Sequence, residues 1–261
     1  VAALRVGAEL LYLCTAEEAT GPIKAYSPEL MVSSVYRWSH ISDDRPEVRA
    51  QEQDNLVNKM MELLPRLHAL VIGPGLGRDD GVLAAVARVI VEAKKRKLPL
   101  VIDADGLWLI ERRPDLVLDY PEAVLTPNAA EHRRLSLALL GHEKFDTSAL
   151  CKALRGPIVI LKGATDQICS TDRKRLECSE EGAPRRPGGL GDVLAGTTAI
   201  LITWSALRGK DMALACQAAC VIVRKACRGA FAKNKRAMVA TDVLDELGAV
   251  FEELCPASWE C

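Results

Sequence analysis

Short apolar runs that end in turn-forming or charged residues recur along the middle of the chain. They read "LHALVIGPG", "PLVIDADG", "EAVLTPN" and "GPIVILKG". A strand in a parallel sheet is covered on both faces, so its sequence is continuous Val, Ile and Leu rather than an alternation. These runs therefore predict buried parallel strands.

Helical patterns lie between these runs and after the last of them. The clearest spans Asp79 to Lys97 and closes on basic residues, which complement the negative end of the helix dipole. One face of this segment is apolar and consists of Val82, Val86, Val89 and Ala93. After Val193 the pattern predicts long helices, among them Asp211 to Lys233 and Thr241 to Leu254.

Strands and helices that alternate in this way predict an α/β fold with a doubly wound, mainly parallel sheet flanked by helices. Ligands of such sheets bind at the carboxyl ends of the strands. The length of 261 residues fits a single domain spanning 1–261. Ser33 to Asn55 is polar and lacks a convincing period, so we expect a surface loop or an insertion there.

Composition narrows the classes of partner. The net charge is −1 and aromatic residues make up 4% of the chain, so nothing favours binding to nucleic acid. No apolar run reaches the length that we expect of a membrane span, and the sequence from Val1 onward shows no signal-peptide pattern. We therefore expect neither nucleic acid nor a membrane as a partner.

The chain has nine cysteines, which form no paired C-x-x-C clusters. A zinc site and a disulfide scaffold are therefore not expected, and a reducing compartment fits best. Cys216, Cys220 and Cys227 recur at helical spacing, which predicts a packed face of small apolar side chains.

The stretch "RRPGGLGDVLAG" combines a glycine-rich turn with the start of an apolar helix. Gly188, Gly189 and Gly191 allow backbone N–H groups to converge where the positive end of the helix dipole lies. Such a turn can hold a phosphate, and Asp192 beside it could accept a proton from an attacking hydroxyl. The alternative is that Asp192 only caps the helix.

Three further features also allow either a ligand-binding role or a purely structural one. Lys162 follows a strand and would approach a bound phosphate if the strand ends adjoin, or else lies on the surface. Arg185 and Arg186 could clamp phosphate or be solvated loop charges. The turn "GPGLG" follows a strand, but Arg78 stands where the dinucleotide fingerprint requires glycine, so it indicates either a close approach to a ligand or a simple turn.

Carboxylate and amide side chains follow two of the predicted strands. Asp103 and Asp105 lie in "DADG", and Asp105 could cap the next helix. Asn128 and Glu131 share one helical face, which suits water-mediated Mg²⁺ beside a polyphosphate, although Asn128 could equally be a helix cap. His132 is interpreted as a helix-surface residue.

Taken in order, "VIGPGLGRDD", "VIDADGLWL", "VLTPNAAEHRRL", "LKGATD" and "GGLGDVLAG" closely resemble the NAD(P)H-hydrate dehydratase family of the ribokinase-like superfamily. The wording "GRDD" with "DADGLWL" resembles the eukaryotic, ATP-dependent branch. The resemblance implies repair of a damaged cofactor. It further implies that ATP would be the co-substrate and that the S epimer of NADH or NADPH hydrate would be dehydrated, its hydroxyl being phosphorylated before phosphate is eliminated.

The resemblance also implies which residues perform each role. Asp192 would be the base, and Gly188, Gly189 and Gly191 would form the anion hole. Mg²⁺ would be held with the help of Glu131. ATP would bind Lys162, Gly163, Ala164, Thr165, Asp166, Gly182, Ala183, Pro184, Arg185, Arg186, Pro187, Gly188, Gly189, Leu190 and Gly191. The hydrated dinucleotide would bind Gly75, Asn128, Ala129, Ala130, Glu131, His132, Arg133, Arg134 and Asp192.

Against the family pattern, the chain opens inside a helix that usually follows an N-terminal strand and loop, so we expect those elements to be lacking. Two rival functions are a small-molecule kinase of the same superfamily and a non-catalytic nucleotide-binding protein. A dinucleotide-dependent oxidoreductase is disfavoured by Arg78. A homo-oligomer is compatible with the sequence, and the expected localisation is cytoplasmic, mitochondrial or both.

Overall fold

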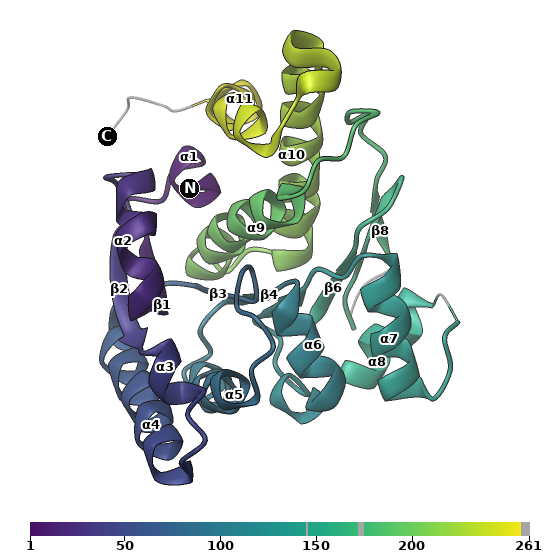
Figure 1. Ribbon diagram of the computed structural model, residues 1–261. Coiled ribbons are helices and arrows are strands. Elements are labelled where there is room, and N and C mark those ends of the chain that lie inside the picture. The colour runs from purple at the N-terminus through teal and green to yellow at the C-terminus, as the bar shows by residue number, and fades with distance from the viewer. Residues whose placement is uncertain (145, 172–174, 257–261) are drawn as a thin grey trace.

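The core of the computed structural model, which describes residues 1–144, 146–171 and 175–256, is a six-stranded sheet (Figure 1). The strands follow one another across the sheet in chain order. The first four are parallel and the last two are antiparallel to their neighbours. They are β3 (Leu70–Ile72), β4 (Leu100–Ile102), β5 (Ala123–Leu125), β6 (Ile158–Leu161), β7 (Asp166–Cys169) and β8 (Leu176–Cys178). The four strands expected from the apolar runs are confirmed.

Alternate residues of each central strand face opposite sides of this sheet. In β4, Leu100 and Ile102 belong to one hydrophobic cluster and Val101 belongs to the other. All three side chains are fully buried. Both faces of the sheet are therefore covered, which explains why these strands read as continuous apolar runs.

Helices from the strand-to-strand connections cover one face of the sheet (Figure 1). They are α5 (Asp80–Lys95), α6 (Asp105–Arg112), α7 (Ala129–Leu140) and α8 (Thr147–Leu154), with a short 3₁₀ turn η2 (Pro114–Leu116) after α6. The side chain of Asp79 accepts hydrogen bonds from Gly81 and Val82 N–H and so caps α5, within the helix predicted over Asp79 to Lys97. Consecutive right-handed crossovers that progress in one direction all lie on the same face.

The opposite face is covered by the C-terminal helices together with the first residues of the chain (Figure 1). These are α9 (Leu190–Leu207), α10 (Met212–Asn234), the 3₁₀ turn η3 (Lys235–Ala237), α11 (Ala240–Leu254) and α1 (Ala2–Arg5). The α/β class with a mainly parallel sheet flanked by helices is thus confirmed, with the second helical layer supplied by the chain termini instead of by crossovers.

Helix α9 is, by length and composition alone, apolar enough to cross a membrane, and 56% of it is buried inside the fold. The expectation that no apolar run reaches such a length is wrong for this segment. The helix packs against α10, α1 and the central strands β3 and β4, so its apolar character serves the core of the fold.

The N-terminal part of the chain forms a separate two-stranded parallel pair, β1 (Tyr12–Ala16) with β2 (Met31–Tyr36), joined by α2 (Glu17–Tyr26). Next come α3 (Trp38–Ile41), α4 (Pro46–Leu63) and the 3₁₀ turn η1 (Leu64–Arg66). The expectation of a surface loop over Ser33 to Asn55 is therefore wrong for most of that segment. The buried hydrophobic side chains of α4 start only at Leu56, so the first turns of the helix are polar and show no apolar stripe.

The eight cysteines that the structure describes are all free. Cys216, Cys220 and Cys227 are buried on α10 and pack in the hydrophobic cluster against the sheet. The interpretation of these residues as small apolar side chains is confirmed. Burial raises the pKa of the Cys227 thiol to about 11, so this group stays protonated at neutral pH.

Candidate active site

An ion pair with a buried carboxylate joins the carboxyl ends of β4 and β6, the strands on either side of β5. Asp103 follows β4 and is 2% exposed, and its Oδ1 lies 2.7 Å from Nζ of Lys162, which follows β6. The backbone N–H of Lys162 donates to the carbonyl of Pro127, which follows β5, at 2.9 Å. Three strand ends are thereby fixed together at the edge where parallel sheets bind ligands.

The N-terminus of α9 meets this ion pair directly. A Cβ atom on Gly191 would lie 3.1 Å from Oδ2 of Asp103 and 3.4 Å from Nζ of Lys162. Gly189, the N-cap, has a φ of +91°, a left-handed conformation that favours glycine. The two glycines therefore let the first turn of α9, with its intrahelically unsatisfied N–H groups, approach the charged pair closely.

Asp192 lies in this first turn of α9. Burial raises the pKa of its carboxyl, the negative charge of Asp103 raises it further, and the ammonium of Lys162 opposes both effects. A carboxylate with a raised pKa is a stronger base. Gly189 is the N-cap and no side chain caps this helix, so the alternative of Asp192 as a simple cap is not realised.

The turn after β3 is fastened to the same strand end. Gly73 has a φ of +124°, and a Cβ atom there would lie 1.7 Å from the backbone oxygen of Asp103, so glycine is required. Asp105 accepts hydrogen bonds from the backbone N–H of Gly77 at 3.2 Å and from Nε of Arg78 at 2.8 Å. The carboxyl of Asp105 therefore holds the "GPGLG" turn.

The alternative of Asp105 as a helix cap is not realised, because the N-cap of α6 is Ala104. Ala104 has a φ of +46° and a ψ of −120°, a conformation that costs about 1–3 kcal/mol for a residue with a Cβ. The strained residue stands between Asp103 in the ion pair and Asp105 in the turn. The two carboxylates on either side of it have different partners, Lys162 for Asp103 and the Gly77–Arg78 backbone and side chain for Asp105.

A capping box begins α7 at the end of β5. Asn128 Oδ1 accepts from the N–H groups of Ala130 and Glu131, and Glu131 Oε2 accepts from the N–H of Asn128 at 2.7 Å. The alternative of Asn128 as a cap is confirmed. Glu131 Oε2 also lies 4.0 Å from Nζ of Lys162, which brings a third carboxylate to the site.

His132 is fully buried, so its interpretation as a helix-surface residue is wrong. Its Nδ1 lies 3.4 Å from the hydroxyl of Ser136 one turn along α7. Burial lowers the pKa of the imidazole and favours the neutral form. His132 is therefore a buried side chain of α7 that contacts Ser136.

The tight turn between β6 and β7 forms the next wall of the site. Asp166 Oδ1 accepts from the backbone N–H of Gly163 at 2.9 Å. The carbonyl of Gly163 accepts from Arg186 at 3.1 Å and from Arg224 at 2.8 Å. The bond from Arg186 connects the turn to the glycine-rich segment that precedes α9, and the bond from Arg224 connects it to α10.

Comparison with known proteins identifies the family. The family model for NAD(P)H-hydrate dehydratase matches residues 1–248. The chain belongs to the NAD(P)H-hydrate dehydratase family. A relative from Bos taurus, named ATP-dependent (S)-NAD(P)H-hydrate dehydratase, is 41% identical over 98% of this chain and 77% of its own length.

Solved structures agree with the ribokinase-like fold expected of the family. A ribokinase-like superfamily protein from Enterococcus faecalis matches with a TM-score of 0.72 and 21% identity, over 97% of this chain and 80% of that one. An ADP/ATP-dependent NAD(P)H-hydrate dehydratase from Bacillus subtilis, co-crystallised with ATP/Mg²⁺, matches with a TM-score of 0.68 and 20% identity. That match covers 97% of this chain and 82% of the other.

Part of the residue set implied by the NAD(P)H-hydrate dehydratase family converges in the structure. Asp192, Gly191, Lys162 and Glu131 gather around Asp103. Gly75 has a φ of +66°, and a Cβ there would meet no atom within 4 Å, so this turn is open to a ligand.

Other members of the set face different partners. Arg133 lies 3.7 Å from Glu143, and Arg134 donates to Glu111 at 2.8 Å, so both arginines make ion pairs along helix surfaces. Nε of Arg185 donates to the carbonyl of Met238 at 2.9 Å, which fixes the loop before α11 to the glycine-rich segment. The described contacts of these arginines therefore do not bring them to the Asp103–Lys162 pair.

Two residues of this site are not assigned a role from the sequence. Asp103 is noted there only as an aspartate at a strand end, because its partner Lys162 is remote in sequence. Arg224 lies in the middle of α10, where a single arginine has no distinguishing signal. Only the folded chain brings each of them to the site.

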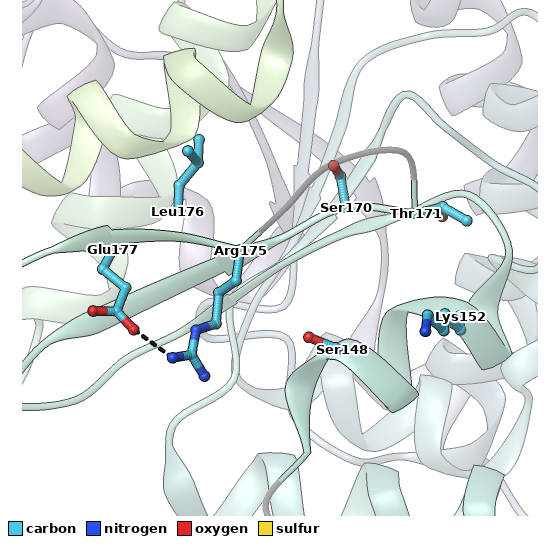
Figure 2. A pocket seen from close by; sticks show the side chains of 7 residues that line it. All are labelled: Ser148, Lys152, Ser170, Thr171, Arg175, Leu176 and Glu177. Atoms are coloured by element: carbon cyan, nitrogen blue, oxygen red, sulfur yellow. Dashed lines mark ion pairs between the residues drawn. The ribbon is translucent and has the colours of Figure 1, made fainter.

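Two recesses in the described part of the chain lie away from this site. A recess of about 700 Å³ lies beside α8 and the β7–β8 strands, and Figure 2 shows the ion pair of Arg175 with Glu177 in it. Another recess, of about 580 Å³, is lined by residues of β2, α3 and α4. The charged site lies at the strand ends, and neither recess is lined by Asp192, Asp103 or Lys162.

Proposed function

We propose that the chain is an ATP-dependent dehydratase that converts the S epimer of NADH or NADPH hydrate to NAD(P)H, with release of ADP and phosphate. One observation carries the proposal. The first turn of α9 places Gly191 against the Asp103–Lys162 pair, next to a carboxylate of raised pKa, Asp192. The family membership and the curated relative support this choice of substrate and nucleotide.

The residues of the site divide the chemistry between them. Asp192 accepts the proton of the substrate hydroxyl as its oxygen forms a bond to the γ-phosphorus of ATP and the bond to ADP breaks. Backbone N–H groups of the Gly188–Gly191 turn and the ammonium of Lys162 stabilise the charge on the phosphoryl oxygens. Phosphate is a better leaving group than hydroxide, so the C–O bond then breaks, the adjacent ring carbon loses a proton to solvent, and the ring double bond is restored as phosphate leaves.

The residues present suit a Mg²⁺ ion carried by ATP. Among the described residues no group of three or more His, Cys, Asp or Glu side chains could hold a metal ion, so a dedicated protein cage is not found there. Mg²⁺ in nucleotide sites is commonly held by one or two carboxylates plus phosphate oxygens. Glu131, 4.0 Å from Lys162, supplies such a carboxylate, and the ion would neutralise charge on the phosphates.

The open turn around Gly75 and the N-terminus of α7 are proposed to hold the hydrated dinucleotide. Gly75 lies on a turn that Asp105 holds, and Asn128 to Glu131 form the capped start of α7. The positive end of a helix dipole suits the phosphates of a dinucleotide.

Product analysis separates the proposal from its rivals. The purified chain is mixed with S-NADH hydrate, Mg²⁺ and either ATP or ADP, and reduced-nicotinamide absorbance is followed together with free phosphate. When ATP is the nucleotide, the absorbance and the free phosphate should rise together. A stable phosphorylated product without free phosphate would establish a kinase, and ATP binding without turnover would establish a non-catalytic protein.

A further inference from the structure

A single arginine outside the reacting groups binds several segments of the proposed nucleotide site. Arg224 lies on α10 with its side chain 14% exposed. Its Nε donates to Oδ2 of Asp166 at 2.6 Å, and its Nη2 donates to the carbonyl of Gly163 at 2.8 Å. Its Nη1 donates to the carbonyl of Glu180 at 3.1 Å. Every nitrogen of the guanidinium therefore has a different acceptor.

The first two acceptors belong to one tight turn that closes on itself. Asp166 uses Oδ1 to accept from the N–H of Gly163 while Oδ2 accepts from Arg224. A Cβ atom on Gly163 would lie 2.9 Å from the carbonyl oxygen of Thr165, so the turn has little freedom to change shape. The guanidinium thus fixes both the carboxylate and the carbonyl that define the turn directly after Lys162.

The third acceptor lies at the start of the other nucleotide-binding segment. Glu180 comes two residues before Gly182, and a Cβ atom on Gly182 would lie 3.7 Å from Cγ of Arg224. The aliphatic part of the arginine therefore packs against the chain that leads to the glycine-rich turn, while its head group holds the turn between β6 and β7. No side chain with a single donor centre could span this arrangement.

We propose that Arg224 is a positioning residue for ATP, which sets the spacing between the Lys162–Asp166 turn and the segment that begins at Gly182. The inference rests on the proposed function, since it takes these two segments as the walls of the ATP site. Arg224 acts through the backbone and through Asp166, and it contributes to nucleotide affinity without contacting the hydrated dinucleotide.

Lysine at this position tests the geometry while keeping the charge. Arg224→Lys retains one cationic donor but cannot serve three acceptors in fixed directions. Hydrogen bonds to charged groups contribute substantially to stability, so the loss of this geometry should displace the two segments. The Kd for ATP should therefore rise at least about tenfold. The KM for ATP should rise by the same factor, while the KM for the hydrate and kcat at saturating ATP stay within about twofold of the unmodified chain.

The matched control lies one turn along the same helix. Arg228 donates to Oε1 of Glu180 at 2.6 Å and its side chain is 46% exposed. Surface ion pairs contribute little. Arg228→Lys should therefore leave the Kd for ATP unchanged within about twofold. Equal ATP affinities of Arg224→Lys and Arg228→Lys would overturn the proposal.

Calorimetric titration with ATP separates this inference from the proposed activity, because it needs no turnover. Binding of ATP by the unmodified chain without dehydration would refute the proposed function and still test Arg224. If Arg224→Lys does not fold, Asp166→Asn supplies the second variant, since it weakens the same turn and leaves the arginine on α10. If folded Asp166→Asn then binds ATP with the Kd of the unmodified chain, the proposal is overturned. It is also overturned if the unmodified chain binds no ATP.

Discussion

Replacing Gly191 by alanine should disturb the catalytic ion pair without unfolding the protein. The new Cβ would lie 3.1 Å from Oδ2 of Asp103 and 3.4 Å from Nζ of Lys162, so the Asp103 carboxyl must retreat by a few tenths of an ångström. A misplacement of about 1 Å at reacting groups costs about 10²-fold in rate, so this smaller shift predicts a loss of roughly threefold to tenfold in kcat. Alanine is about 1 kcal/mol better than glycine inside a helix, so the melting temperature should not fall.

The control is the same substitution where a helical glycine has open space. Gly21 lies in α2, and a Cβ there would meet no atom within 4 Å. Gly21→Ala should keep the kcat of the unmodified chain. Initial rates of reduced-nicotinamide recovery at saturating ATP and hydrate, with melting curves for both variants, give the comparison. A folded Gly191→Ala variant with unchanged kcat would refute the reasoning that the geometry of the Asp103–Lys162 pair limits the rate.

The remaining predictions concern the substrate turn and the acid limb of the rate profile. Asp105→Asn weakens the bonds from residue 105 to Gly77 and Arg78, so the KM for the hydrate should rise about fivefold, which is equivalent to ~1 kcal/mol. The KM for ATP should stay unchanged. Steady-state kinetics measure both constants, and an unchanged KM for the hydrate would contradict the prediction. Because Asp192 must be ionised to accept a proton, kcat/KM should fall with decreasing pH at a pKa above the ~3.9 of ordinary Asp. Asp103→Asn should move this limb to lower pH, since it removes a negative charge near Asp192, and an unmoved limb would exclude Asp192 as the titrating base.

The central strands and the helices around them could be predicted because burial leaves a direct mark on sequence. Each residue of β4 is fully buried, so the segment can be nothing but apolar. The start of α5 at Asp79 could be predicted for a similar local reason, because a side chain must accept the first free N–H groups.

The elements that could not be predicted depend on partners remote in sequence. Strand β8 is short and contains the exposed Glu177, so it becomes a strand only through pairing with β7. The early turns of α4 are polar, and one of their carboxylates, Glu52, is buried because it accepts from the backbone N–H of Arg37 at 2.6 Å. Neither the pairing of β8 with β7 nor the bond between Glu52 and Arg37 leaves a periodic signal in the sequence.

The candidate site divides in the same way. The glycine-rich turn could be predicted as a cradle because Gly189 adopts a left-handed backbone conformation that favours glycine. The close approach of Gly191 to Asp103 and Lys162, and the contacts of Arg224, depend on how strands and helices assemble. Sequence alone therefore predicts the cradle and proposes Lys162 beside it, but not the pairing of Lys162 with Asp103.

The most direct test of the account measures reaction stoichiometry in the unmodified chain and in Asp192→Asn. With S-NADH hydrate, Mg²⁺ and ATP, the account predicts equal amounts of reduced nicotinamide, ADP and free phosphate. It predicts that all three fall to the uncatalysed level in Asp192→Asn while ATP still binds. Recovery of reduced nicotinamide by Asp192→Asn at the wild-type rate would contradict the role of this carboxyl as the base.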